Sequence, residues 1–293
     1  MELLQLQYFQ TVARFEHMTK AAESLRIAQP ALSKTIARLE LDLGVPLFDR
    51  QGRQIRLNQY GKAFLNRVNG ALAMLEEGKQ ELADLAGAEN GSIRLATNSL
   101  GRLSGSLGTF RERYPNVNFR IKQIAPSRME EMARLLQEGE IDLAFTAAPL
   151  EQPNIRNMPV VSAAVYLAVP PGHKFTGRGS IRLREAAVEP FVEYQAGHPF
   201  RKVNDSFCRE AGFEPNIVCE VEEPASLSNL VQAGLGVAFM PVCKPDEMAG
   251  LSLLPIAEPV CARTYTLAWH EQRYLTKAAQ TFRDYIVDYF MKD

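Results

Sequence analysis

An amphipathic helix that follows a short bend constrains the first part of the chain more than any other feature. Between Gln29 and Gly44, apolar residues recur at steps of three and four, which places them on one helical face: Leu32, Ile36, Leu39 and Leu43. Pro30 suits the first turn of such a helix, and Gly44 suits its C-terminal cap. We therefore expect a helix over residues 30–43 with one buried face.

Two shorter helices are expected before it. Residues 3–15 repeat apolar side chains at helical spacing, and Thr19 is a suitable N-cap for a second helix. Ala21 and Ala22 are small enough to let two helices cross closely. The turn at residues 26–28 then leads into the third helix. The pattern predicts a helix-turn-helix.

Polar and basic residues of this segment suit a nucleic acid. Gln29 can both donate to and accept from a base edge, and Lys34 and Arg38 suit phosphates. Residues 50–57 alternate basic and apolar side chains, as in a β wing along a DNA backbone. The candidate DNA contacts are Thr19, Gln29, Pro30, Ala31, Ser33, Lys34, Arg38, Arg50, Arg53 and Arg56. On periodicity alone, an ordinary three-helix bundle with a solvated basic loop fits equally well.

Composition narrows the class of protein. A length of 293 residues favours two domains, and 46% hydrophobic with 23% charged residues is typical of a globular protein. No apolar run is long enough for a membrane span, and the N-terminus lacks the basic start of a signal peptide, so a cytoplasmic location is expected. The net charge of −1 means that any basic patch is local.

A long helix is expected next, from Asn58 to about Gly87. Its apolar residues repeat at three- and four-residue steps, and it is too apolar to stand alone in water. It could pack on the N-terminal domain, but we favour a coiled-coil-like pairing with the same helix of a second chain. The small polar residues 87–91 then form a hinge.

From Ser92 onward, strand and helix patterns alternate. Expected strands are 93–96, 117–124, 142–145, 191–194, 217–221, 237–239 and 264–269; expected helices are 100–114, 127–137, 199–211, 225–232 and 273–290. Ser127 and Glu130 form a candidate capping box. Such alternation predicts parallel sheets of the α/β class, here as two similar lobes with a cleft between them.

Ligand residues are sought where parallel strands end and helices begin, because both meet at such a cleft. The candidates are Thr97, Asn98, Ser99, Ser127, Arg128, Thr146, Gln195, His198, Phe200, Arg201 and Glu222. An organic acid is the favoured ligand, with Arg128 or Arg201 as its partner. The acidic Glu222 and Glu223 leave a cationic or zwitterionic ligand open. Any single hydroxyl residue here is more commonly a helix cap.

The run from Ala21 to Arg50 closely resembles the winged helix-turn-helix signature of LysR-type transcriptional regulators. The matching pattern is A-A-x-x-L-x-x-x-Q-P-A-L-S-x-x-I-x-x-L-E-x-x-L-G-x-x-L-F-x-R. The resemblance implies that Gln29, Pro30, Ser33, Lys34 and Arg53 lie at the DNA. Met18-Thr19 and Asn58 depart from the commoner residues, but Thr and Asn remain good N-caps.

The rest of the chain resembles the effector domain of the same family, itself similar to periplasmic binding proteins. The matching stretches are 91–95, 114–117, 136–144 and 230–241. The resemblance implies a winged helix-turn-helix at 1–58, a linker helix and hinge at 59–90, and an α/β effector domain at 91–293. Lobe I would comprise 91–162 and 266–293, and lobe II 163–265.

The same resemblance implies the partners. They are double-stranded promoter DNA, a small-molecule effector, RNA polymerase and further copies of the chain, paired through the linker helices as a homodimer or homotetramer. No cofactor or metal is expected.

Three other functions are disfavoured. No nucleophile elbow, zinc or phosphate-loop motif is present, which argues against an enzyme. A solute-binding protein would need a secretory signal and no helix-turn-helix. Peroxide-sensing members of the resembled family carry a cysteine after a Gly-His pair, whereas Pro199 follows Gly197-His198 here. The scattered Cys208, Cys219, Cys243 and Cys261 are expected to be buried thiols.

Overall fold

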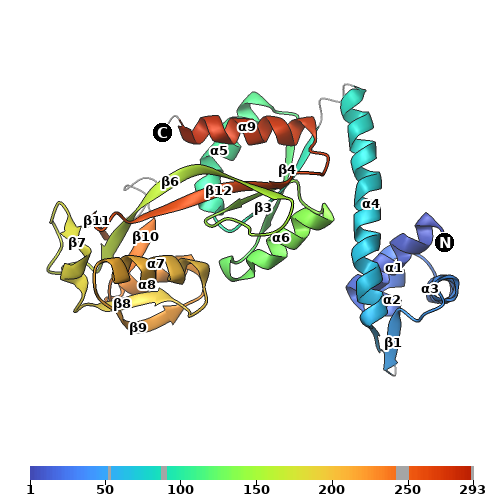
Figure 1. Cartoon of the computed structure of the whole chain (residues 1–293), viewed down its shortest axis with the longest axis horizontal. Helices are drawn as coiled ribbons and strands as arrows, with labels where there is room; N and C mark the ends of the chain where they lie inside the picture. Colours follow the sequence, from blue (N-terminus) through green and yellow to red (C-terminus); the bar gives the residue numbers. More distant parts are fainter. Residues whose placement is uncertain (52–53, 87–90, 242–250, 292–293) are drawn as a thin grey trace. The chain divides into compact units, whose positions relative to one another are not determined.

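A computed structural model describes residues 1–51, 54–86, 91–241 and 251–291 (Figure 1). The chain divides into two compact units. One is Met1–Ala88 with Gln137–Glu140, and the other is Glu89–Leu136 with Ile141–Asp293. Within the described ranges, no helix is long and apolar enough to cross a membrane.

The first unit is a three-helix core with a β hairpin and a long helix. Its elements are α1 (Leu3–Phe15), α2 (Met18–Leu25), α3 (Gln29–Leu43), β1 (Phe48–Gln51), β2 (Gln54–Leu57) and α4 (Gln59–Leu85). Phe9 of α1 and Leu32 and Leu39 of α3 are buried at the centre, as the apolar spacing of the two helices predicts. The expected cap at Thr19 is wrong. The Nδ1 atom of His17 accepts the Lys20 N–H at 3.4 Å, so α2 begins before Thr19.

Side chains of the helices hold the hairpin in place. The Glu40 carboxylate accepts the N–H groups of Leu47 and Phe48 at 2.7 and 3.3 Å, and Glu16 accepts the Leu57 N–H at 2.9 Å. Asn58 caps α4 by accepting the Gly61 N–H at 2.9 Å, as expected. The wing is therefore attached to α3 and to the end of α1 by side-chain hydrogen bonds.

The second unit has two lobes joined by two long strands, β6 (Ile155–Val169) and β12 (Ala262–His270) (Figure 1). Lobe I contains β3 (Ser92–Thr97), α5 (Leu100–Arg113), β4 (Asn118–Gln123), η1 (Pro126–Arg128), α6 (Met129–Glu138), β5 (Leu143–Thr146) and α9 (Lys277–Met291). Lobe II contains β7 (Ile181–Arg182), η2 (Leu183–Ala186), β8 (Pro190–Tyr194), α7 (Pro199–Glu210), β9 (Asn216–Val221), α8 (Pro224–Gln232), β10 (Ala238–Pro241) and β11 (Ser252–Glu258).

The sheets are mixed rather than parallel throughout. The strands β4, β3 and β5 pair in parallel, as do β8 and β9, but β12 pairs antiparallel with β6, from Ala262 opposite Ala164 to His270 opposite Ile155. The expectation of parallel sheets therefore holds for these strands within the lobes but not for β6 and β12, because the chain passes between the lobes as extended antiparallel strands. The expected strands do not include β6, β7 or β11, and the last helix begins at Lys277 rather than at Arg273.

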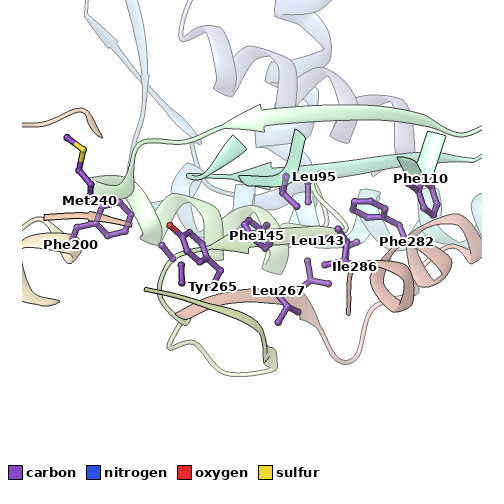
Figure 2. Close-up of a cluster of buried hydrophobic side chains, with 14 of the residues drawn as sticks. Leu95, Phe110, Leu143, Phe145, Phe200, Met240, Tyr265, Leu267, Phe282 and Ile286 are labelled. Atoms are coloured by element: carbon purple, nitrogen blue, oxygen red, sulfur yellow. The ribbon is translucent and has the colours of Figure 1, made fainter. Parts of the chain in front are cut away.

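The capping box expected at Ser127 is also absent. A short 3-10 turn, Pro126–Arg128, precedes α6, and the Ser127 hydroxyl donates to the Glu222 carboxylate of lobe II at 3.1 Å. One hydrophobic cluster runs through both lobes. Figure 2 shows it extending from Phe110 and Phe282 in lobe I to Phe200 and Met240 in lobe II, with Phe145 and Tyr265 between them.

Candidate functional site

The first unit presents one polar, exposed face of α3. Leu32, Ile36 and Leu39 are buried, so the other face points to solvent. On that face Gln29, Pro30, Ala31, Lys34 and Arg38 are exposed, and Ser33 is half-buried. Ala28 forms the N-cap of α3 without a side-chain hydrogen bond. A face with short side chains, one amide and two cations fits the width and charge of a major groove.

The other predicted DNA residues belong to α2 and to the hairpin sequence. Thr19 is exposed in the first turn of α2, and Arg56 is exposed on β2. Arg50 pairs with Ile55 in the register of the hairpin. Arg53 lies outside the described residues.

The second unit contains a cavity of about 890 Å³ between its lobes. Lobe I contributes residues that follow β3 and β4, and lobe II contributes the ends of β8, β9 and β10 and the starts of α7 and α8. Strand β12 adds Arg263 and Tyr265. The lining residues are Asn98, Ser99, Leu100, Gly101, Arg102, Gln123, Ile124, Ala125, Pro126, Tyr194, Phe200, Glu222, Glu223, Leu227, Ser228, Phe239, Met240, Pro241, Arg263 and Tyr265. This volume suits a small metabolite.

Polar groups behind the cavity wall form a buried network. The Asn204 amide donates to both oxygens of Glu193, at 2.9 and 3.1 Å, and its Oδ1 accepts from Nη2 of Arg263 at 3.2 Å. Burial raises the pKa of Glu193 to about 7. Burial also raises the pKa of Tyr194 to about 12, against the lowering effect of the nearby Arg263.

Of the residues predicted from strand ends, Asn98, Ser99, Phe200 and Glu222 line the cavity. Thr97 and Thr146 do not line it, because both are buried at the ends of β3 and β5. The Thr97 hydroxyl accepts the Ser99 N–H, and the Thr146 hydroxyl donates to the Ala148 carbonyl. Gln195 is exposed and also lies outside the lining.

Two predicted anion partners are engaged elsewhere. Arg128 is exposed and pairs with Glu131, and Arg201 pairs with Asp205 at 2.8 Å and Glu220 at 3.0 Å. Neither arginine lines the cavity, so the idea that one of them binds a ligand carboxylate finds no support in the geometry. Strand-end reasoning instead missed Arg263 and Tyr265, which lie within a strand.

His198 caps α7 by accepting the Phe200 N–H at 3.1 Å, and its ring stacks on Tyr194 with centroids 4.3 Å apart. Burial, helped by Arg263, lowers the pKa of His198 to about 4, so the ring is neutral at physiological pH. It supports the cavity wall from behind without lining it.

The described cysteines are free thiols. Cys208 and Cys261 are buried, and burial raises the pKa of each to about 12, which disfavours the reactive thiolate. Cys243 lies outside the described residues. In the part of the chain that the structure describes, no group of His, Cys, Asp and Glu could hold a metal ion.

Comparisons with known proteins match both units of the chain. Residues 3–62 match the bacterial regulatory helix-turn-helix protein, lysR family, and residues 86–291 match the LysR substrate binding domain. YybE of Bacillus subtilis (strain 168), an uncharacterized HTH-type transcriptional regulator, is 39% identical over 99% of both chains.

Two solved structures share the fold over nearly the full length. A variant of full-length OxyR from Pseudomonas aeruginosa gives a TM-score of 0.77 at 24% identity, covering 98% of this chain and 94% of its own. CbnR complexed with its target DNA gives 0.72 at 21% identity, covering 100% and 99%. Together, the two matched domains and the full-length relative show that this chain belongs to the LysR family of DNA-binding transcriptional regulators, with an effector-binding domain after the helix-turn-helix.

Proposed function

We propose that the exposed face of α3 reads promoter DNA, with Gln29 at a base edge and Lys34, Arg38 and Arg56 at phosphates. The observation that carries this assignment is the division of α3 into a buried apolar face and an exposed polar face at its N-terminal end. Thr19, Pro30, Ala31 and Ser33 lie beside it, where short side chains permit close approach. Arg50 and Arg53 belong to the same proposal through the wing sequence.

The DNA assignment is tested with sites selected from random duplexes by the wild-type protein. Gln29→Ala should lose about 1–3 kcal/mol of discrimination at one base position. Lys34→Ala should instead weaken binding to all sequences and reduce the salt slope by about 1. Lys202→Gln, an exposed cation in the second unit, is the control. Unchanged DNA binding in both α3 variants would refute the assignment.

We also propose that the cavity between the lobes is the effector site. It has contributions from both lobes and from the β12 strand that joins them, so a ligand there interacts with each. Binding that differs between two lobe arrangements would shift their populations and so alter the presentation of DNA-binding domains. No cofactor is needed for this action, which we place in the cytoplasm.

The partner copy is proposed to bind along α4. Apolar side chains on its second half are exposed, with Leu82 68% exposed, and they border a groove of about 640 Å³ against α1. A helix that leaves such side chains in water is stabilised by a second copy. We propose a homodimer at this face, assembled further into a homotetramer that contacts RNA polymerase at promoters.

The dimer is tested by Leu82→Glu with Lys62→Gln as its control. Leu82→Glu puts a charge on the apolar face and should lower the mass measured by light scattering, whereas Lys62→Gln changes an exposed charge of α4 outside the groove. An unchanged mass for Leu82→Glu would contradict pairing through this face.

A further inference from the structure

Arg263 is a buried cation on the wall of the cavity. Its side chain lies on β12 and is 2% exposed. One nitrogen, Nη2, donates to Asn204 at 3.2 Å, and the guanidinium lies 4.0 Å from the centre of the Phe200 ring. The Nε–H has no hydrogen-bond partner. A buried donor of this kind is costly unless something accepts from it.

The charge of Arg263 also lacks a direct counter-ion among the described residues. Glu193 is linked to it only through Asn204, and both Glu193 oxygens already accept from the Asn204 amide. One of them also accepts the Tyr194 N–H at 2.7 Å. Buried cations in proteins are normally paired with anions. The cavity beside Arg263 is therefore a place where an anion would be stabilised.

Asn98 offers a second donor from the opposite lobe. It is 8% exposed, and its Oδ1 accepts from the Ala147 N–H at 3.2 Å and from the Ser99 hydroxyl at 3.1 Å. Those two contacts use its oxygen, while its Nδ2 has no partner. A ligand with more than one acceptor atom can therefore be bound from lobe I as well as from β12.

The other lining residues indicate which chemical groups the rest of the ligand carries. Most of its large side chains are apolar or aromatic: Ile124, Tyr194, Phe200, Leu227, Met240 and Tyr265. Figure 2 shows Phe200, Met240 and Tyr265 gathered at one end of the shared hydrophobic cluster. Glu222 and Glu223 also belong to the lining and would repel a negative charge placed beside them. These features describe one anionic group on a compact apolar body.

We propose that the cavity binds a monocarboxylic acid with a ring or similarly compact apolar body, whose carboxylate lies against Arg263. The inference rests on the proposed effector site and adds the chemical class of the effector and the residue that recognises it. Arg263 suits a carboxylate because its planar donors match the two oxygens. The ring would lie among the aromatic residues on the same wall.

The first experiment uses the full-length wild-type protein and needs no variant. Titration calorimetry compares phenylacetate with phenylacetamide, which has the same body without the charge, and with acetate, which has the charge without the body. We expect phenylacetate to bind about tenfold or more tightly than phenylacetamide, because a charge-assisted hydrogen bond is replaced by a neutral one. Acetate should bind more weakly than phenylacetate.

The second experiment assigns the preference to Arg263. Arg263→Gln should abolish the difference between acid and amide, and Arg263→Lys should retain part of it. Arg128→Gln removes an exposed arginine outside the cavity and should leave the difference intact. The fluorescence of the single tryptophan, Trp269 on β12, reports whether each variant is folded. If Arg263→Gln does not fold, an undiminished preference for the acid in Arg263→Lys still contradicts the role of Arg263.

The outcomes separate this inference from the proposed function. Equal affinity for acid and amide, or no binding of either, overturns the ligand class, while binding of selected DNA tests the regulator independently. A charge preference that survives in Arg263→Lys and Arg263→Gln alike overturns the role of Arg263. Preferential binding of phenylacetate with no change in DNA affinity supports the ligand class and contradicts the effector role of the cavity.

Discussion

Replacing Glu193 by Gln should stabilise the second unit more at pH 8 than at pH 5. Glu193 is 1% exposed, and burial raises its pKa from 4.5 to about 7. The folded protein holds the proton on Glu193 more tightly than the unfolded chain does. The contribution of this group to stability is therefore fully present below the unfolded pKa of 4.5 and is lost as the pH rises through the folded pKa of about 7. Gln resembles the protonated carboxyl in shape and cannot ionise.

The magnitude follows from the two pKa values. With pKa values of 4.5 unfolded and about 7 folded, ionisation of Glu193 costs about 1 kcal/mol at pH 5 and about 3 kcal/mol at pH 8. The difference in free energy of unfolding between Glu193→Gln and the wild type should therefore be about 2 kcal/mol larger at pH 8 than at pH 5. In the variant, the Asn204 amide can donate to the oxygen of the introduced side-chain amide in place of the carboxylate.

The difference between the two proteins is the quantity to measure. His198 opposes Glu193 in the wild type: its pKa is lowered to about 4, so its contribution is present above the unfolded value of 6.5 and is lost as the pH falls through 4. The two slopes partly cancel in the wild-type profile, but His198 is common to both proteins. Subtracting the free energy of unfolding of the wild type from that of the variant at each pH then leaves the contribution of Glu193.

The assay is urea unfolding at pH 5, 6, 7 and 8, followed by Trp269 fluorescence. Trp269 is the single tryptophan and lies in the second unit, so the signal reports on that unit. Glu214→Gln is the control, since Glu214 is exposed in the same unit and loses the same charge. A difference between Glu193→Gln and wild type that stays constant from pH 5 to 8 would refute the reasoning.

Two further predictions concern packing and thiol chemistry. Gly61→Ala should destabilise the first unit by about 1–3 kcal/mol, because the added Cβ would lie 2.1 Å from the Leu47 carbonyl oxygen. The control is Gly70→Ala on the same helix, whose Cβ meets no atom within 4 Å and which should stabilise the unit by about 0.5–1 kcal/mol. Hydrogen exchange of peptides from residues 3–43 measures both, and equal protection in the two variants would contradict the steric argument. Cys208 and Cys261 should react with peroxide more slowly than free cysteine because burial raises their pKa to about 12; mass spectrometry of each peptide measures this, and rapid oxidation of either would contradict it.

The first unit was largely predictable from sequence because its signals are local. The stripe of Leu32, Ile36 and Leu39 specifies the buried face of α3, and the remaining face is then exposed by default. Asn58 also caps α4, as its side chain predicts. The Thr19 cap failed because His17, a less usual capping residue, lies two positions earlier and accepts the Lys20 N–H first.

The cavity was predictable only in part. Asn98, Ser99 and Glu222 follow strands, and such positions can be found from the alternation of strand and helix. Arg263 and Tyr265 lie inside β12, where the local pattern says only that a strand is present. Their place in the cavity depends on the antiparallel pairing of β12 with β6, about a hundred residues earlier in sequence, which local periodicity does not reveal.

That pairing also explains how a ligand could act on both lobes. Arg263 contacts lobe II through Asn204 and Phe200. Two residues later, Tyr265 contacts lobe I: the Arg102 guanidinium lies 4.8 Å from the centre of its ring, and the Phe145 ring stacks on it with centroids 5.7 Å apart. The register of β12 against β6 shifts directly after Tyr265, so the strand changes its pairing where it passes between the lobes. An anion that neutralises Arg263 therefore changes the electrostatics of the strand that joins them. Differential stabilisation of one lobe arrangement requires a contact of this kind, made at the junction rather than within either lobe alone.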